Sequence, residues 1–259
     1  MTAEHTQSPV SVYYKFLDTG GRARFGDGTW HLPNSGRPGK WMPEITGLVP
    51  CQRGYHVATP GQLVDWLGPE LFEVECRGEH VALGDKHVFG QARLVRRVDA
   101  WNDRTARLFA ADCAARVLHL FEACCPGDMR PRRAIDVARA FANGQATVED
   151  LAAARDAAKA AAERAAKDAP WDAAWDAAWD AGWAAARAAT GGAAWAAARA
   201  AAKDAACAAA RAAAGWVARD AARAATWYAA WEAAREWQTR RLFQLISAGH
   251  AQSLREEEP

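Results

Sequence analysis

PWDAAWDAAWDAGW, residues 170–183, is the stretch that decides the fold of this chain. Tryptophan recurs at every fourth position, and the residues between are mostly alanine, which has the highest helix propensity of all residues. A step of four residues overshoots one helical turn by roughly 40°, so the indoles follow one drifting stripe. The segment therefore predicts an α-helix that carries Trp171, Trp175, Trp179 and Trp183 along one side.

This tryptophan stripe has two interpretations. In the first, alanine faces let helices approach closely and the indoles fill the gaps between them. We favour this reading because aromatic residues at helical spacing usually belong to a core. In the second, the four tryptophans form an exposed platform, which makes them candidate residues for binding a partner. An aspartate follows each of the first three tryptophans, and its carboxylate could accept a hydrogen bond from an indole N–H.

The alanine-rich composition continues beyond the tryptophan helix. Gly191-Gly192 predicts the end of that helix, and a long helix, or a pair of helices bent at Gly215, is expected from about Ala193 to Ile246. Ala-Ala-Arg recurs every twelve residues, from Arg187 to Arg235. Twelve residues rotate a helix by roughly 120°, so this repeat does not keep to one face.

Three more helices are expected before the tryptophan helix. The first begins at the N-cap Asn102 and stops near Pro126-Gly127. The second runs from Pro131 to Asn143-Gly144, a helix-ending signal. The third begins at Thr147, where Thr-Val-Glu-Asp resembles a capping box with aspartate in place of glutamate.

Residues 12–98 have a different composition, rich in glycine, proline, valine and aromatic residues. The pattern predicts short strands over residues 12–17, 71–76, 79–83, 86–89 and 92–98, with turns at Gly78, Gly84-Asp85 and Gly90. Alternation places Phe72, Val74 and Cys76 on one face. A capping box with proline at the first helical position, residues 59–62, predicts one helix among the strands.

The expected fold class is α+β: a small, mainly antiparallel β domain followed by an alanine-rich, tryptophan-studded helical bundle. We expect the β domain over residues 12–100 and the bundle over residues 101–247. A disordered N-terminus, residues 1–11, and a frayed acidic tail, residues 248–259, complete the predicted organisation.

Composition limits the classes of partner. The formal net charge of the 259 residues is +1, so no overall electrostatic attraction draws the chain to nucleic acid or an anionic membrane, and we expect neither as a partner. No secretory signal or apolar stretch long enough to span a membrane is present, which predicts a cytoplasmic protein. The excess of alanine and of arginine over lysine indicates a GC-rich bacterial or phage genome. No nucleotide-binding or hydrolase motif appears, and we expect no cofactor.

Cysteine and histidine residues of the β domain supply the candidate reactive groups. Their spacing suggests a metal site, since zinc takes four such ligands, although the tight C-x2-C pair of common zinc modules is missing. Cys76 and His80 are four residues apart and are expected on one strand face. His56, presented by a turn after Gly54, is the candidate catalytic residue. The candidate metal ligands are Cys51, His56, Cys76 and His80.

A group of arginines could contact phosphate, but a solvated strand edge and helix start is the favoured interpretation. The group consists of Arg93, Arg96, Arg97, Arg104 and Arg107.

Two sets of residues resemble known families. CQRGYH, residues 51–56, followed by residues 65–67 and 72–75, resembles an uncharacterised small domain of phage and actinobacterial proteins. Its relatives often carry a further cysteine where this chain has Ala58. Residues 107–113, 130–135 and 147–152 resemble a family of alanine-rich helical immunity proteins. These resemblances imply an association with toxin–immunity or phage genes.

The expected function is protein binding without catalysis, in the form of toxin neutralisation by an immunity protein or of a phage accessory protein. Two alternatives stay open. The β domain could bind a small ligand or act as an enzyme centred on His56. The tryptophans could instead join copies of the chain into a self-assembling homo-oligomer.

Overall fold

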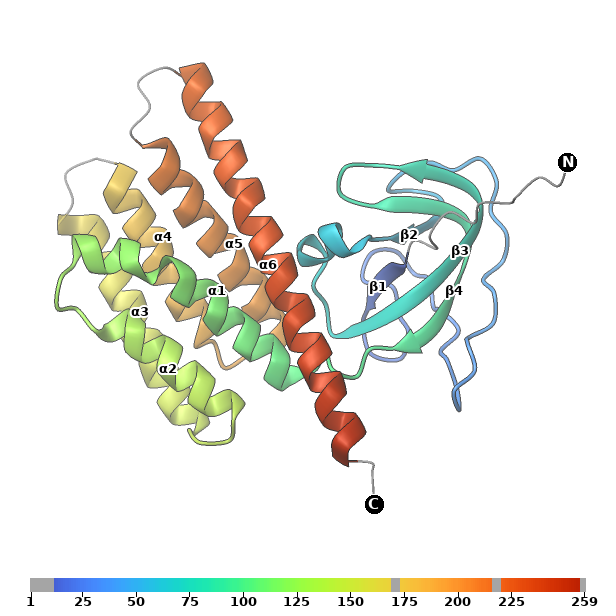
Figure 1. The fold of residues 1–259 in the computed structure, drawn as a ribbon, viewed down its shortest axis with the longest axis horizontal. Helices are drawn as coiled ribbons and strands as arrows, with labels where there is room; N and C mark the ends of the chain where they lie inside the picture. Colours follow the sequence, from blue (N-terminus) through green and yellow to red (C-terminus); the bar gives the residue numbers. More distant parts are fainter. Residues whose placement is uncertain (1–11, 169–172, 216–219, 257–259) are drawn as a thin grey trace, which may run out of the picture. The chain divides into compact units, whose positions relative to one another are not determined.

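The computed structural model describes residues 12–168, 173–215 and 220–256. The chain divides into two compact units, residues 1–98 and residues 99–259 (Figure 1). Within the described residues, the first unit (the β unit) holds an antiparallel sheet and the second (the helical unit) holds α-helices. The fold is therefore α+β, with the β part first and the alanine-rich, tryptophan-studded bundle second, as the composition predicts. The disordered N-terminus expected over residues 1–11 lies outside the described residues.

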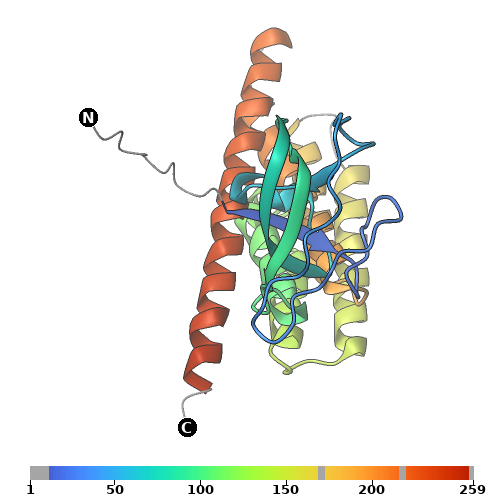
Figure 2. The same ribbon diagram turned by 90° about the vertical axis from the view of Figure 1, so that its right-hand side faces the viewer.

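The sheet of the β unit has the strand order β1-β3-β4-β2, with every neighbouring pair antiparallel. It curls until its edge strands meet, because Tyr14 and Ala58 exchange two backbone hydrogen bonds of 2.8 and 2.9 Å. The long hairpin of β3 and β4 is strongly twisted (Figure 2). The strands are β1 (Tyr13–Leu17), β2 (Tyr55–Val57), β3 (Glu70–Ala82) and β4 (His87–Arg97).

The core of the β unit lies inside this curled sheet. Phe72, Val74 and Cys76 face it, as their alternation predicts. Trp30 and Met42 join them from the long segment between β1 and β2. That segment also pairs with β4 through residues 39–45, so it covers the part of the β4 edge that β2 leaves open.

Gly78 and Gly90, where the sequence predicted turns, lie within strands instead. Gly78 adopts φ +83° in a β-bulge, where the β3–β4 register shifts between Arg77 and His80. Gly90 lies inside β4, where an added Cβ would come within 2.7 Å of the Ile45 carbonyl oxygen. The separate short strands expected over residues 71–98 are therefore wrong. Two long strands run through both glycines, because one absorbs a bulge and the other admits a close backbone approach.

The helix predicted at residues 59–62 is present as a short 3₁₀ helix, η1 (Pro60–Asp65). Its capping box is formed, since Gln62 Oε1 accepts a 3.0 Å hydrogen bond from the Thr59 backbone N–H. Two of its own residues, Leu63 and Val64, are buried.

The helical unit begins and ends its helices where the sequence marks them. Asn102 caps the first helix by accepting a hydrogen bond from the Thr105 backbone N–H, and Asp150 and Thr147 bond each other reciprocally at the start of the third. The pair of helices after Gly191-Gly192 is also confirmed. The helices are α1 (Asp103–Cys124), α2 (Arg130–Ala142), α3 (Val148–Asp168), α4 (Ala173–Ala188), α5 (Ala194–Ala214) and α6 (Asp220–Glu256).

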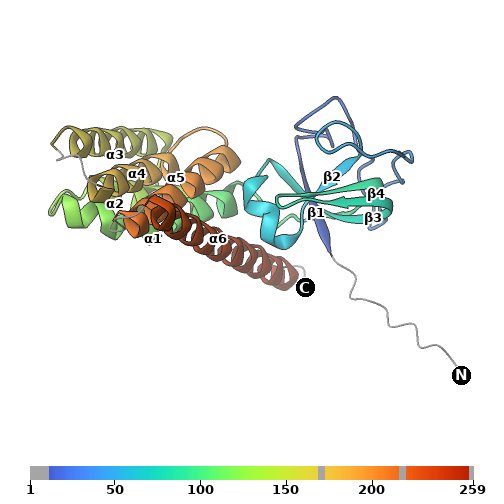
Figure 3. The ribbon, with the colours of Figure 1, turned by 90° about the horizontal axis from the view of Figure 1, so that it is seen from above.

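Alanine fills most of the interface between α4 and α5, where many alanines are completely buried. The helix α6 lies at the margin of the unit and runs obliquely to the others (Figure 3). It extends to Glu256, past residue 247, where we expected the bundle to end in a frayed tail. The last three residues of that expected tail, 257–259, lie outside the described residues.

Candidate functional site

The tryptophans of α4 are half-buried rather than displayed on an open face. Trp175, Trp179 and Trp183 each keep part of their surface exposed, and the rings of Trp179 and Trp183 meet edge to face with centroids 6.1 Å apart. Trp171, the fourth candidate, lies outside the described residues. The described part of the stripe thus contributes both to packing and to the surface.

Two cations flank Trp183. Lys159 Nζ of α3 lies 6.0 Å from the ring centroid, and the Arg187 guanidinium lies 5.1 Å from it. The indole N–H is buried and finds no hydrogen-bond acceptor among the described residues. Asp176 and Asp180, the described aspartates that follow tryptophans, therefore do not serve this indole as acceptors.

Asp180, which follows Trp179, instead faces α5. Its Oδ2 lies 3.1 Å from Arg211 Nε but has no aligned hydrogen bond within the described residues. Burial raises the pKa of this carboxyl to about 6, against the opposing effect of Arg211. Asp180 is thus a proton-binding group held between two helices.

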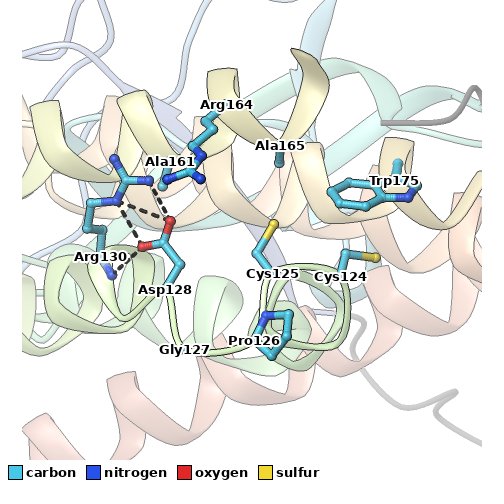
Figure 4. Close-up of a pocket in the computed structure, with 10 residues that line it drawn as sticks. All are labelled: Cys124, Cys125, Pro126, Gly127, Asp128, Arg130, Ala161, Arg164, Ala165 and Trp175. Carbon is cyan, nitrogen blue, oxygen red and sulfur yellow. Dashed lines mark hydrogen bonds and ion pairs between the residues drawn. The ribbon is translucent and has the colours of Figure 1, made fainter. Parts of the chain in front are cut away.

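Trp175 lines a pocket of about 510 Å³ in the helical unit (Figure 4). The turn after α1, with Asp128, and the first residue of α2, Arg130, form one wall, and α3 forms another with Arg164. Figure 4 shows the Trp175 indole at one end and the charged side chains at the other. The remaining lining residues are Cys124, Cys125, Pro126, Gly127, Ala161 and Ala165.

The charged end of this pocket is organised by Asp128. Its carboxylate accepts a 2.8 Å hydrogen bond from Arg130 Nε and another, of 3.2 Å, from the Arg130 backbone N–H. The first of these contacts is the main reason why the pKa of Asp128 lies below its usual value. These hydrogen bonds hold the turn between α1 and α2. Because the Asp128 carboxylate stays ionised at neutral pH, it also neutralises Arg130, one of the two arginines that line the pocket.

In the β unit, His56 organises a turn. Its Nε2 accepts a 2.8 Å hydrogen bond from the backbone N–H of Cys51, a residue with the positive φ of +68°. Burial, followed by the nearby Lys15, lowers the pKa of the imidazole. His56 is therefore held neutral, with its acceptor nitrogen engaged in the fold. To act as a catalytic base, His56 Nε2 would have to give up its hydrogen bond to the Cys51 backbone N–H and accept a proton from a substrate.

The four candidate metal ligands do not gather at one place, although Cys51 and His56 are neighbours. Cys76 pairs with Ala92, whereas His80, beyond the bulge, pairs with Phe89. Phe89 and Ala92 belong to one core cluster, against which Cys76 packs, and a β-bulge separates the two candidate ligands along β3. His80 instead stacks on Phe89 and contacts His87 Nδ1 through Nε2 at 2.9 Å. Among the described residues, no three His, Cys, Asp or Glu side chains gather as a metal site would require.

The arginine group is engaged within the protein. Arg93, Arg96 and Arg97 form ion pairs with Glu75, Glu73 and Glu70 across β3 and β4. Arg104 bonds the Asn143 side chain. Arg107 is buried and donates to the carbonyls of Thr190 and Gly192, beyond the end of α4.

One charged residue of the β unit was missed by the sequence reasoning. Lys15 lies on the same face of β1 as Leu17, which belongs to the core of the curled sheet, and Tyr13, which packs against that core. Its Nζ donates a 2.7 Å hydrogen bond to the backbone carbonyl of His56. The alternation within YYKFL, residues 13–17, was the signal that could have revealed an inward-facing lysine.

No family model, curated protein or solved structure matches the chain. Within residues 12–168, 173–215 and 220–256, no helix combines the length and apolar character needed to cross a membrane.

Proposed function

We propose that the chain binds a protein partner without catalysis, and that its helical unit carries the binding surface. The observation that supports this most directly is an aromatic cluster on α6, formed by Trp227, Tyr228 and Trp231. Trp227 stacks on Trp231 with centroids 5.2 Å apart and planes inclined by 12°. It meets Tyr228 edge to face at 5.3 Å.

This α6 cluster is exposed to solvent to an extent that is unusual for large aromatic residues. Tyr228 is 62% exposed, and both tryptophans are half-buried. Tyrosine and tryptophan are enriched among the residues that dominate binding energy at protein interfaces. Because the rings already stack on each other, they would lose little conformational freedom when a partner covers them.

The proposed partner is a toxin, which would make the chain an immunity protein. The resemblance of residues 107–113, 130–135 and 147–152 to alanine-rich immunity proteins supports this form of the proposal. A phage accessory protein with another protein partner is the alternative within the same class. Trp175 and Trp179 on α4 form a second candidate contact, although their partial burial favours a role in packing.

A neutralisation experiment tests the proposal. The product of the gene beside the one that encodes this chain is expressed as the candidate toxin, with and without this chain, and the complex is measured by titration calorimetry. We expect rescue of growth and a complex of fixed stoichiometry. The double variant Trp227→Ala/Tyr228→Ala should weaken binding by roughly 1–3 kcal/mol, about fivefold to 150-fold in Kd, with unchanged helix content. Glu232→Ala, an exposed neighbour on α6, is the control and should bind normally.

The same experiment separates the two aromatic sets. Trp175→Ala/Trp179→Ala should lower the melting temperature, because these indoles pack within the helical unit, and any loss of binding should follow from unfolding. Absence of rescue together with absence of a complex would refute the toxin proposal. Light scattering that shows a stable oligomer, lost in Trp227→Ala, would indicate self-assembly instead.

A further inference from the structure

The pocket lined by Trp175, Asp128, Arg130 and Arg164 (the Trp175 pocket) is large enough for a small organic molecule. Its volume is about 510 Å³, and ligand pockets of proteins commonly measure about 300–1,000 Å³. Small side chains, among them that of Ala165, lie between its two ends (Figure 4). A flat molecule can therefore reach from one end of the pocket to the other.

The indole of Trp175 forms the first end of the Trp175 pocket. Trp175 lies in the first turn of α4 and is partly exposed. Cys124 Sγ donates a 3.6 Å hydrogen bond to the carbonyl oxygen of Ala174, which holds that turn of α4 against the end of α1. An indole fixed in this way offers its surface to another aromatic ring, because aromatic pairs are favourable in offset-stacked and edge-to-face arrangements.

The second end of the pocket carries two guanidinium groups and one carboxylate, which is an excess of one positive charge among these lining residues. The carboxylate, that of Asp128, already accepts hydrogen bonds from Arg130. Arg164 is exposed on α3. Its guanidinium has five N–H donors in a planar fork, so it can hold a ligand carboxylate in addition to contacts within the protein. This end therefore favours an anion.

We propose that the Trp175 pocket binds small aromatic carboxylates, with the ring against Trp175 and the carboxylate against Arg164. The two ends of the pocket recognise the two halves of such a ligand, and the small side chains between them leave room for its planar body. Binding involves no covalent step. The proposal is independent of the protein partner proposed for the aromatic cluster on α6, because the pocket lies between other helices.

The test titrates the full, isotopically labelled chain with cinnamate and follows the indole N–H signals by NMR. The signal of Trp175 is identified by its absence from Trp175→Phe. We expect that signal to shift with a saturable dependence on cinnamate, with a Kd of about a millimolar or tighter for a ligand of this size. Cinnamamide, which has the same shape without the charge, should bind about tenfold more weakly or worse, because it cannot form the charge-assisted hydrogen bonds to Arg164.

Variants of α3 locate the carboxylate. Arg164→Gln should weaken cinnamate binding about tenfold and leave cinnamamide binding unchanged. Lys167→Gln removes the same charge from α3 at a residue outside the pocket lining, and it should bind cinnamate like the wild type. A Trp175 signal that does not shift, equal affinities for the acid and the amide, or equal losses in the two variants would each overturn the proposal. The comparison of acid with amide uses the wild type, so it does not depend on the folding of a variant.

Discussion

One missing methyl group sets how closely α3 and α4 pack. A Cβ added to Gly182 would come within 2.8 Å of the Ala162 Cβ and 3.3 Å of a ring carbon of Phe121. Gly182 therefore lies where α3, α4 and α1 converge, and the glycine in the tryptophan segment serves packing rather than a helix break.

We predict that Gly182→Ala destabilises the protein despite the better helix propensity of alanine. The propensity gain is about 1 kcal/mol, whereas overpacking costs about 1–3 kcal/mol, so the net loss should be about 1 kcal/mol. Urea unfolding followed by circular dichroism measures it. Gly191→Ala, whose added Cβ would meet nothing within 4 Å, is the control. A variant as stable as the wild type would show that α3 and α4 can separate without cost.

At the scale of elements, charged pairs fix the alignment of α4 and α5. Two smooth alanine surfaces fit each other at several offsets, so alanine alone specifies register poorly. Asp180 pairs with Arg211, and Arg187 pairs with Asp204. Arg187 lies seven residues after Asp180 on α4, and its partner Asp204 lies seven residues before Arg211 on α5. This is the correspondence that two antiparallel helices require. Two arginines of the twelve-residue repeat thus take part in setting the register.

We predict that Asp180 makes this hairpin more stable at mildly acidic pH. Its pKa of about 6 in the folded protein exceeds the ~3.9 of an unfolded chain. The folded state therefore binds the proton more tightly, and stability falls as the pH rises from about 4 to about 6, by an amount on the order of 2–3 kcal/mol.

Thermal unfolding between pH 4 and pH 7 measures this effect. The side chain of Asp180→Asn cannot titrate. The difference in unfolding free energy between the wild type and this variant therefore reports the titration of Asp180 alone, although Arg211, Asp204 and Asp176 influence its pKa. The wild type should lose stability relative to Asp180→Asn as the pH rises. Parallel profiles for the two proteins would contradict the prediction.

At the scale of the whole helical unit, one carboxylate joins three helices. Asp112 of α1 accepts a 2.9 Å hydrogen bond from Arg139 of α2 and a 2.8 Å hydrogen bond from Nε of Arg241 on α6. Its side chain is only 16% exposed. These contacts connect α6, at the margin of the unit, to the centre of the bundle.

We predict that Asp112→Asn destabilises the helical unit by about 2 kcal/mol, because both charge-assisted hydrogen bonds weaken. The midpoint of urea unfolding measures the change. Asp136→Asn, at an exposed position on α2, is the control and should unfold like the wild type. Equal midpoints for both variants would show that the three helices are held by apolar packing alone.

The sequence predicted those features that depend on local signals. Asn102, Thr147 and Gly144 mark helix ends through their own neighbours, so the α-helices were placed almost correctly. The extent of β3 was not predicted correctly, because a glycine in a β-bulge cannot be distinguished in a sequence from a glycine in a turn. The closure of the sheet at Tyr14 and Ala58 joins residues far apart in the chain, and no local pattern announces it.

The candidate site was predictable to a smaller extent. The tryptophan spacing correctly placed α4, but it could not show which indoles are covered, because that depends on where α3 and α5 lie. His56 was chosen for its chemistry, and its ring accepts a backbone hydrogen bond within a turn. Lys15 was overlooked although its alternation with Tyr13 and Leu17 was visible. The hydrogen bonds of Asp112 could not be predicted from the sequence, because the partners of its carboxylate come from α2 and α6.

The alanine interface of α4 and α5 has a practical consequence for mutagenesis. Alanine scanning, the usual means of mapping important positions, is silent where the side chain is already alanine. Ala181, Ala198 and Ala202 are fully enclosed, so information there comes from enlargement. Exchanges to serine, valine and leucine, in that order, would chart how much room each position has, and the tightest positions would trace the line along which the two helices touch.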